Sequence, residues 1–251
     1  MNSLRALPAL LIAFTAPVAL AADHGHHWGY AGESGPPHWA AMEKEFASCG
    51  IGKAQSPIDI KTSSVRAADL PAIGFDYRAS PLRLVDNGHT VQVNYAPGSF
   101  ITIDGARYEL VQFHFHKPSE EKVDGKAFDM VAHLVHKDAQ GRLAVVAVPL
   151  AKGKENAAIA TLWKNLPREK EHEARLDAVS INAADLLPAQ RGYYAFEGSL
   201  TTPPCSEGVR WFLLKQPTTL SAGEIATFGK LYPMNARPVQ PLNGREVRSS
   251  R

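Results

Sequence analysis

From Ile73 onward, apolar residues recur in short runs with turn residues between them, a pattern typical of a β-rich protein. Asn87-Gly88, Asp104-Gly105 and Asp124-Gly125 are tight-turn signals between such runs. The run 143–148 is apolar on both faces, as a central strand of a large sheet would be. The predicted strands are Ile73–Tyr77, Leu82–Asp86, Thr90–Tyr95, Phe100–Ile103, Tyr108–His116, Met130–His136, Leu143–Leu150, Tyr193–Phe196 and Val209–Lys215.

Helical spacing of apolar residues predicts three helices beside these strands. They are His38–Cys49, Glu155–Asn165 and Ser221–Leu231, whereas Asp23–Pro37 is polar and predicted to be irregular. No internal repeat, low-complexity tract or linker interrupts 23–251. The pattern therefore predicts a single, mainly β domain of the α+β class.

The first 21 residues form a segment of a different kind. Arg5 gives a weakly basic start, Ala6–Leu20 is almost wholly apolar, and Ala19-Leu20-Ala21 fits a small-x-small cleavage site. We therefore predict a secretory signal peptide over 1–21, which leaves 22–251 as the mature domain. An uncleaved signal anchor is the alternative. No later segment has the apolar length to cross a bilayer.

Composition narrows the function classes. The chain is 45% hydrophobic, which is ample for a packed core, and it carries a formal net charge of +2 without a basic stripe. Nucleic acid is therefore not an expected partner. Cys49 and Cys205 are the two cysteines, and in an exported protein an even count predicts one disulfide between them. Two buried free thiols are the alternative.

The segment Gln112–His116 carries the clearest chemistry in the chain. Successive side chains of a strand point to opposite faces, so His114 and His116 share one face while the two phenylalanines of the segment pack on the other. Two imidazoles cannot close a metal site, but His133 in the next predicted strand can supply a third nitrogen. Three neutral nitrogens with one open tetrahedral position are the ligand set of a catalytic zinc ion. Ordinary surface or core histidines are the alternative.

The stretch between these two strands predicts how they pair. Residues 117–126 are polar and end in the turn signal Asp124-Gly125, so the strands are expected to be antiparallel neighbours. His136 lies three residues beyond His133, an odd number, and is therefore expected to face away from the metal.

A series of motifs carries a more specific signal than any single one of them. They are His27-Trp28-Gly29-Tyr30, Gln55-Ser56-Pro57-Ile58-Asp59-Ile60, Asn87-Gly88-His89, Gln112-Phe113-His114-Phe115-His116, Pro118-Ser119-Glu120, His133-Leu134-Val135-His136, Gly198-Ser199-Leu200-Thr201-Thr202-Pro203-Pro204-Cys205, Asn235-Ala236-Arg237-Pro238 and Gln240-Pro241-Leu242. In this order and spacing, the chain resembles the α-class carbonic anhydrases in their bacterial exported form, across nearly all of the mature region.

The resemblance implies a large, mostly antiparallel twisted β-sheet with short surface helices, and one Zn²⁺ at the base of a conical cleft. It implies reversible hydration of CO₂ to bicarbonate and a proton, by attack of a zinc-bound hydroxide on CO₂. Zinc lowers the pKa of its bound water to about 7 in carbonic anhydrases, an established property of the family.

The resemblance also assigns roles beyond the predicted zinc ligands His114, His116 and His133. Thr201 and Glu120 match the pair that aims the hydroxide; on their own they would be a turn residue and a loop charge. His89 matches the proton shuttle, although a histidine in a turn is more often only a surface residue. Tyr30 and Asn87 match the residues that organise the water between the shuttle and the metal. The substrate pocket, whose residues are otherwise ordinary core positions, is matched by Val135, Val145, Leu200, Thr202, Val209 and Trp211.

Two positions near the predicted zinc site depart from the family pattern. Metal-bound histidines usually donate their other ring N–H to an acceptor, and Gln112 is placed to serve His114. The usual partner of the third ligand is a glutamate two residues before it, where this chain has Val131. We therefore expect His133 to use a water, a backbone carbonyl or another side chain, or to be held more weakly, with faster zinc loss; Val131→Glu would then slow zinc release. Glu121 replaces a frequent histidine, with no consequence evident from the sequence.

Localisation and partners follow from the signal segment and the resemblance. The protein is expected in the periplasm, with full secretion as the alternative. Sulfonamides and anions are the expected inhibitors, and a homodimer is left open. The rival functions are a zinc esterase side activity and a non-catalytic zinc- or ligand-binding module on the same scaffold, although relatives of the second kind typically lack a zinc histidine.

A second metal site is conceivable at the mature N-terminus, in Asp23-His24-Gly25-His26-His27. Cleavage after Ala21 would place a histidine third, and the free amine with that histidine could wrap Cu(II) or Ni(II) in a square plane of nitrogens. A solvated tail is the alternative.

Overall fold

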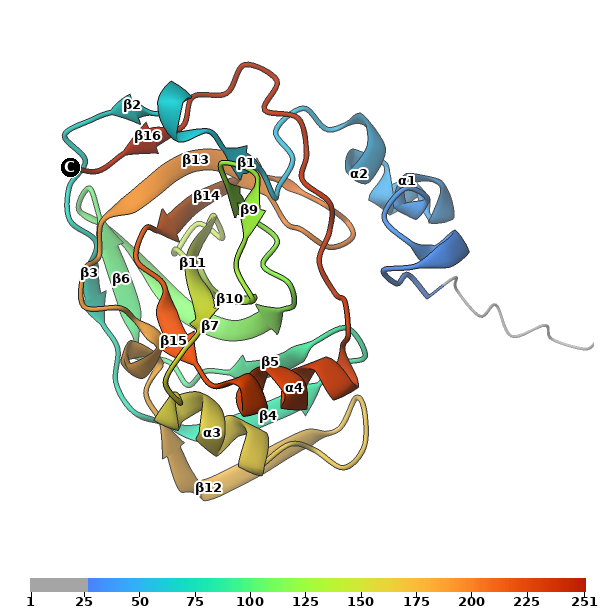
Figure 1. Ribbon diagram of the computed structural model, residues 1–251, viewed down its shortest axis with the longest axis vertical. Coiled ribbons are helices and arrows are strands. Elements are labelled where there is room, and N and C mark those ends of the chain that lie inside the picture. The colour runs from blue at the N-terminus through green and yellow to red at the C-terminus, as the bar shows by residue number, and fades with distance from the viewer. Residues whose placement is uncertain (1–26) are drawn as a thin grey trace, which may run out of the picture.

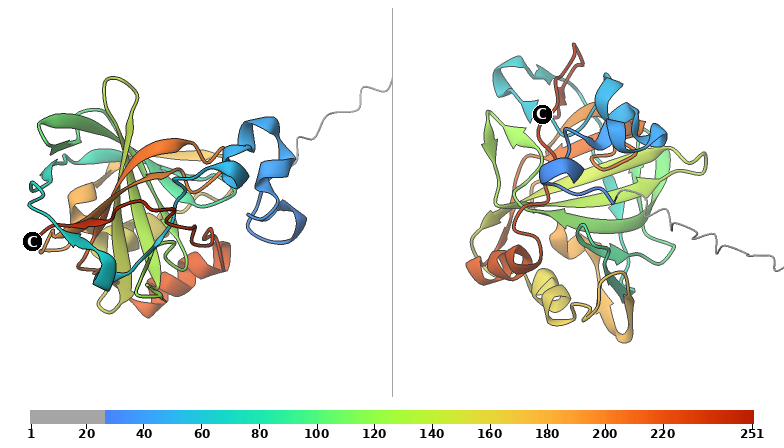
Figure 2. Two further views of the ribbon diagram at one scale, coloured as in Figure 1. Left: turned by 90° about the horizontal axis from the view of Figure 1, so that it is seen from above. Right: turned by 90° about the vertical axis from the view of Figure 1, so that its right-hand side faces the viewer.

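The computed structural model describes residues 27–251, and most of its strands join one large twisted sheet (Figures 1 and 2). The predicted signal peptide 1–21 and the cluster 23–26 lie outside the described residues. The strands are β1 Asp59–Ile60, β2 Arg66–Ala67, β3 Gly74–Asp76, β4 Ser80–Asp86, β5 Val91–Asn94, β6 Phe100–Ile103, β7 Ala106–His116, β8 Lys122–Val123, β9 Lys126–Ala127, β10 Met130–Lys137, β11 Leu143–Lys152, β12 Glu173–Ile181, β13 Tyr193–Ser199, β14 Glu207–Leu214, β15 Thr218–Leu220 and β16 Arg248–Ser249. The α-helices are α1 Trp39–Met42, α2 Ser48–Ile51, α3 Ala157–Lys164 and α4 Ala222–Leu231.

The large sheet has 13 strands, and its main path runs β12-β4-β5-β7-β10-β11-β14-β13-β16-β2. Most neighbours are antiparallel, but β11 pairs in parallel with β14 and β15, and β16 pairs in parallel with β2. A small second sheet joins β1, β8 and β9. This mixed, twisted sheet with a few short helices confirms the predicted fold class of a single mainly β domain.

The two faces of the central strands bury two separate apolar clusters. One contains Phe113 and Phe115 of β7 with Leu134 of β10, and the helices α3 and α4 pack against it with Ile159 and Phe228. The second, on the opposite face, holds residues of β10, β11 and β14 together with Ile58 and Ile60; among its members are Val131, Val145, Val209 and Trp211. Strand alternation therefore leaves His114, His116 and His133 on the face of the second cluster, as predicted.

The two longer helices, α3 and α4, begin at residues whose side chains accept hydrogen bonds from backbone N–H groups. The Glu224 backbone N–H donates to the Ser221 hydroxyl at 3.2 Å, and the Ser221 N–H donates to the Glu224 carboxylate at 2.6 Å, which makes a capping box for α4. Asn156 accepts from Ala158 and Ile159 at the start of α3. Both helices lie within the predicted ranges Glu155–Asn165 and Ser221–Leu231.

One helix prediction from the sequence is wrong, and β12 is the longest of the strands that were not predicted. The single helix predicted over His38–Cys49 is broken into α1, a 3-10 turn over Lys44–Phe46 and α2, because Glu43 is extended. These short pieces lie at one side of the sheet (Figures 1 and 2). The strand β12 was not predicted, because most of its side chains are exposed or half-buried and it pairs only with β4, with a register shift between Leu176 and Ser180.

A disulfide joins Cys49 to Cys205 across a separation of 156 residues, as the cysteine count predicted. It ties α2 to the loop between β13 and β14, where Thr201 lies. None of the helices in the described part of the chain has the length and apolar character needed to span a membrane.

Candidate metal centre

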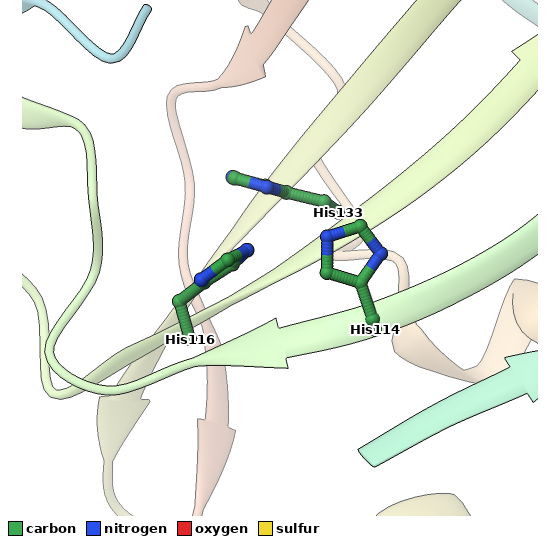
Figure 3. Close-up of side chains that lie close together, drawn as sticks. All are labelled: His114, His116 and His133. Atoms are coloured by element: carbon green, nitrogen blue, oxygen red, sulfur yellow. The ribbon is translucent and has the colours of Figure 1, made fainter. Parts of the chain in front are cut away.

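Three histidine side chains from two neighbouring strands converge on one point (Figure 3). His114 and His116 come from β7 and His133 from β10, which is antiparallel to it with His133 opposite His114. One ring nitrogen from each histidine lies within 4.8 Å of the others. His136 faces away, as expected: its Nε2 lies 2.8 Å from the Tyr77 hydroxyl on the other face of the sheet.

Two of these rings are oriented by neutral oxygen acceptors. Nδ1 of His114 lies 2.8 Å from the Gln112 side-chain oxygen, the partner that the sequence predicted. Nδ1 of His116 lies 2.7 Å from the backbone carbonyl of Asn235, which comes from the C-terminal segment. An acceptor at Nδ1 keeps the ring proton there and leaves the Nε2 lone pair facing the other histidines.

The third ring is oriented by a carboxylate. Nε2 of His133 lies 3.0 Å from Oε1 and 3.2 Å from Oε2 of Glu121, so Nδ1 is the nitrogen that faces the site. Val131, two residues before His133, is fully buried in the second apolar cluster and offers no acceptor. The partner that the sequence left open is therefore the Glu121 side chain, and the expectation of a weakly held third histidine loses its basis.

The inward-facing nitrogens fit a cation. Within residues 27–251, neither the buried Nε2 of His116 nor the buried Oε2 of Glu120 has a hydrogen-bond partner. Glu120 Oε2 lies 3.5 Å from His116 Nε2 and 3.8 Å from His133 Nδ1. Buried polar atoms without partners are costly, and three imidazole nitrogens facing one point are a donor set suited to zinc.

The protonation states of two of the three rings agree with that fit. Burial, followed by the charge of His133, lowers the pKa of His114 to about 3. Burial and the two neighbouring histidines hold the pKa of His116 well below its ordinary value. Burial also lowers the pKa of His133, but the charges of Glu121 and Glu120 outweigh it and raise the pKa overall. His114 and His116 are thus neutral at pH 7, the state that binds a metal ion.

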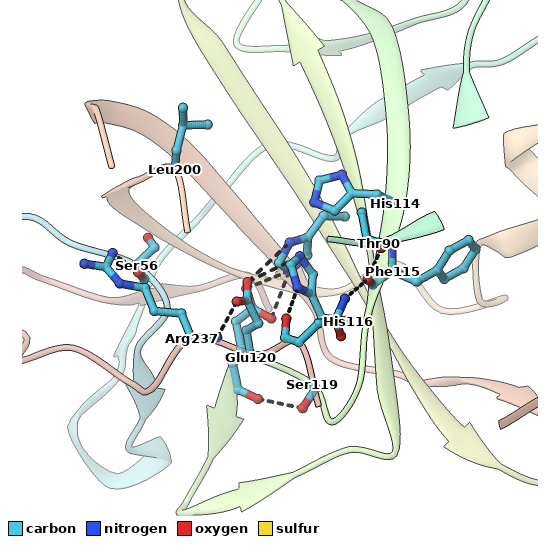
Figure 4. A network of polar contacts seen from close by, with 12 residues as sticks. Ser56, Thr90, His114, Phe115, His116, Ser119, Glu120, Leu200 and Arg237 are labelled. Atoms are coloured by element: carbon cyan, nitrogen blue, oxygen red, sulfur yellow. Dashed lines mark hydrogen bonds and ion pairs between the residues drawn. The ribbon is translucent and has the colours of Figure 1, made fainter. Parts of the chain in front are cut away.

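Glu120 is buried between the histidines and Arg237 (Figure 4). The Arg237 backbone N–H donates to Glu120 Oε1 at 2.7 Å, which leaves Oε2 for the site. Burial raises the pKa of Glu120 to about 7, opposed by His133 and reinforced by Glu121. Thr201, itself buried, is among the groups whose hydrogen bonding lowers that pKa.

A cavity of about 110 Å³ opens beside His114 and His116. It brings together several predicted site residues that are far apart in the sequence. Its lining includes Tyr30, Asn87, His89, Gln112, His114, His116 and Thr202, together with Trp28.

An apolar wall flanks His133. The Trp211 indole contacts the His133 ring edge to face, with the ring centroids 4.9 Å apart. The other apolar residues predicted for the substrate pocket belong to the same second cluster as Trp211; they are Val135, Val145, Leu200 and Val209.

Sequence reasoning gave no role to three residues of this centre. Asn235 acts through its backbone carbonyl, which no side-chain motif reveals, and Arg237 acts partly through its backbone N–H. Glu121 was noted only as a departure from the family pattern. For Glu121 the signal was a second acidic residue next to Glu120, together with the missing acceptor at Val131.

Comparisons with known proteins agree on one family. The sequence profile of the family described as eukaryotic-type carbonic anhydrase matches residues 34–251. The chain is 43% identical to a carbonic anhydrase of Nostoc sp. over 88% of this chain and 85% of that one. It is 44% identical to a carbonic anhydrase of Klebsiella pneumoniae over 95% of this chain and 96% of that one. The α-carbonic anhydrase of Thermovibrio ammonificans, solved with the inhibitor sulfanilamide, superposes with a TM-score of 0.86 at 43% identity, covering 88% of this chain and 98% of that one.

Proposed function

The chain belongs to the α-class carbonic anhydrase family, and on that premise we propose that it hydrates CO₂ reversibly with one zinc ion held by His114, His116 and His133. The observation that carries the zinc site is the set of three ring nitrogens within 4.8 Å of one another, each turned inward by an acceptor on its other side. We assign His114 Nε2, His116 Nε2 and His133 Nδ1 as the ligand atoms.

Three histidines leave one tetrahedral position for solvent, the arrangement of catalytic rather than structural zinc sites. When bound there, zinc supplies a nucleophile at neutral pH, because carbonic anhydrases are the established example of a zinc site that lowers the pKa of a coordinated water to about 7. The acceptors Gln112, Asn235 and Glu121 keep the outer ring protons in place and so preserve the inward lone pairs.

We assign Thr201 and Glu120 to aim the nucleophile. Glu120 Oε1 is occupied by the Arg237 N–H, so Oε2 is the oxygen free to accept the Thr201 hydroxyl proton. Because the Thr201 hydroxyl donates its proton to Glu120, its oxygen can act only as an acceptor toward the attacking oxygen. The attacking oxygen then donates its hydrogen to Thr201, and its lone pair points to the substrate. The disulfide at Cys205 supports this arrangement by tying down the loop that carries Thr201.

CO₂ carries no net charge, so an apolar wall suits it better than a polar one. The cluster of Val135, Val145, Leu200, Val209 and Trp211 supplies such a wall next to His133, and we assign it to hold CO₂. Thr202 lines the cavity on the side of His114 and His116, and we place it at the edge of the same pocket.

Each hydration releases a proton, and we assign His89 to carry it to solvent. His89 lines the same cavity as His114 and His116, and Tyr30 and Asn87 of the same lining could order water there. Burial, then His27 and Lys170, lower the pKa of His89 to about 4, below the value near pH 7 that suits a proton relay, so release of the proton to solvent is favourable and its uptake by the ring is the costly step.

We also propose that the protein is exported to the periplasm, with full secretion as the alternative, after cleavage of 1–21. The Cys49–Cys205 disulfide supports an oxidising compartment. By similarity to the Thermovibrio protein, we propose that sulfanilamide binds at the same centre.

Metal analysis coupled to stopped-flow CO₂ hydration tests the proposal. We expect one zinc per chain, loss of hydration after chelation, and recovery on adding zinc. Hydration that persists after complete zinc removal would refute it. Zinc binding without hydration would favour the non-catalytic module, and ester hydrolysis without CO₂ hydration would favour the esterase.

A further inference from the structure

We propose that Glu121 is the positioning residue of His133: from the loop before β8, its carboxylate holds the Nε2 proton and turns Nδ1 toward the metal. The inference rests on the proposed zinc site. It gives a function to the residue that the family pattern left unexplained.

The carboxylate of Glu121 is committed to this one ring. Glu121 and His133 are both about 1% exposed, and both carboxylate oxygens lie within 3.2 Å of His133 Nε2. Among the hydrogen bonds and ion pairs of residues 27–251, the Glu121 side chain has no other partner. A buried anion is costly without a partner, so the placement of this carboxylate against a single imidazole indicates that its role is to orient that ring.

The loop around Glu121 is fixed by hydrogen bonds on both sides. The Ser119 hydroxyl donates to the Glu121 backbone carbonyl at 2.8 Å and accepts from the Phe128 N–H at 2.8 Å. The Lys122 N–H donates to the Ile58 carbonyl at 3.2 Å, where β8 joins β1. A carboxylate held in this way can orient a ring, whereas a mobile one could not.

Glu121 differs in kind from the acceptors of the other two rings. His114 is held by an amide oxygen on its own strand, and His116 by a backbone carbonyl. The corresponding position on the strand of His133 is Val131, which packs among apolar residues. The acceptor therefore comes from a loop and is charged, and charged acceptors form shorter and stronger hydrogen bonds and make the ring a stronger donor to the metal.

Zinc release to an excess of chelator tests the inference with a readout other than turnover. Glu121→Ala is expected to release zinc about 10- to 100-fold faster than wild type, if the typical loss of metal affinity on removing such an acceptor is expressed in the release rate. Glu121→Gln keeps an acceptor oxygen but loses the charge, so its rate of zinc release is expected to lie between those of wild type and Glu121→Ala. Glu197→Gln, at an exposed glutamate on β13, is the control and should match wild type.

Proton NMR of the zinc-loaded protein gives a second measurement that does not need the alanine variant to fold. In wild type, the Nε2 proton of His133 should resonate far downfield because it is bonded to a carboxylate. Glu121→Gln should move that resonance upfield while the Nδ1 protons of His114 and His116 stay in place.

Two results separate this inference from the proposed function. A wild-type chain that takes up no zinc overturns both. A wild type that binds zinc, with an unmoved His133 resonance in Glu121→Gln or an unchanged release rate in Glu121→Ala, overturns the role of Glu121 alone.

Discussion

The imidazole of His89 lies flat against the indole of Trp28, with the ring centroids 3.5 Å apart and the planes 3° from parallel. Trp28 is in turn held edge to face by Tyr30 and Trp39, so the stack belongs to a packed aromatic group, of which Trp28, Tyr30 and His89 line the cavity. His27 approaches the same imidazole, with ring centroids 4.8 Å apart. The surroundings of His89 therefore control how easily its ring takes up a proton.

Replacing His89 is expected to slow CO₂ hydration where buffer cannot take up the proton. His89→Ala should lower turnover about 100-fold in weakly buffered solution, the lower end of what a positioned proton-transfer group contributes, and added imidazole should restore it. Stopped-flow assays at low and high buffer concentration measure the effect. His172→Ala, at an exposed histidine, is the matched control. Equal turnover of wild type and His89→Ala at low buffer would remove the shuttle role.

Removing the indole should change the pKa of His89. Burial is the largest cause of its low pKa, and burial disfavours the charged ring, so Trp28→Ala should move the pKa upward from about 4 toward 6.5. A proton NMR titration of the His89 ring in both proteins measures the shift. A pKa unchanged by the substitution would mean that other parts of the cavity wall desolvate the ring.

Val131→Glu is expected to destabilise the protein and not to slow zinc release, contrary to the expectation from the sequence alone. Glu121 already occupies His133 Nε2, and Val131 is fully buried among apolar residues, so a new carboxylate there has no free partner. The free energy of unfolding should fall by about 2–3 kcal/mol or more. Urea unfolding and chelator assays measure both effects, with Val131→Thr as the volume-matched control. Slower zinc release from Val131→Glu would show that His133 lacks a sufficient acceptor.

His136 should make stability depend on pH. Burial lowers its pKa to about 3 in the folded protein, whereas an unfolded histidine titrates near 6.5. Between these values the unfolded chain binds a proton that the folded chain does not, so stability is full above pH 6.5 and falls as the pH drops through this window. The loss is about 1.4 kcal/mol per pH unit, or ~5 kcal/mol across it.

The matched variants are His136→Gln and, at an exposed histidine, His172→Gln. Urea unfolding of the metal-free proteins at several pH values between 4.5 and 7.5 gives the slope of stability against pH. In His136→Gln, the slope should fall by the amount that corresponds to uptake of about one proton on unfolding. In His172→Gln, the slope should match that of wild type. The same slope in wild type and His136→Gln would contradict a buried neutral His136.

The convergence of the three histidines followed from strand geometry. Alternation fixed the shared face of His114 and His116, and the predicted antiparallel pairing of their strand with that of His133 is confirmed. The turn Asp124-Gly125, on which that prediction partly rested, instead joins β8 to β9 of the small second sheet. The partners of these rings were harder to foresee. Gln112 lies on the same strand as His114 and was predicted, but the Asn235 carbonyl lies 119 residues from His116 and belongs to an irregular segment.

Glu121 could not be placed from the sequence for a related reason. Its position depends on hydrogen bonds of Ser119 and Lys122 with segments outside the loop, and local propensity says nothing about these. The break in the N-terminal helix was missed because the helical spacing of apolar residues continues across Glu43, where the backbone is extended. The edge strand β12 was missed because few of its side chains are buried, which leaves little apolar alternation to read.

A crystal structure of the zinc-loaded protein, with anomalous diffraction recorded on both sides of the zinc edge, is the decisive test of the metal site. We expect one zinc ion bound by His114 Nε2, His116 Nε2 and His133 Nδ1, with solvent at the fourth vertex. An ion elsewhere, a ring turned away, or the neighbouring Glu120 carboxylate at the fourth vertex would contradict this expectation.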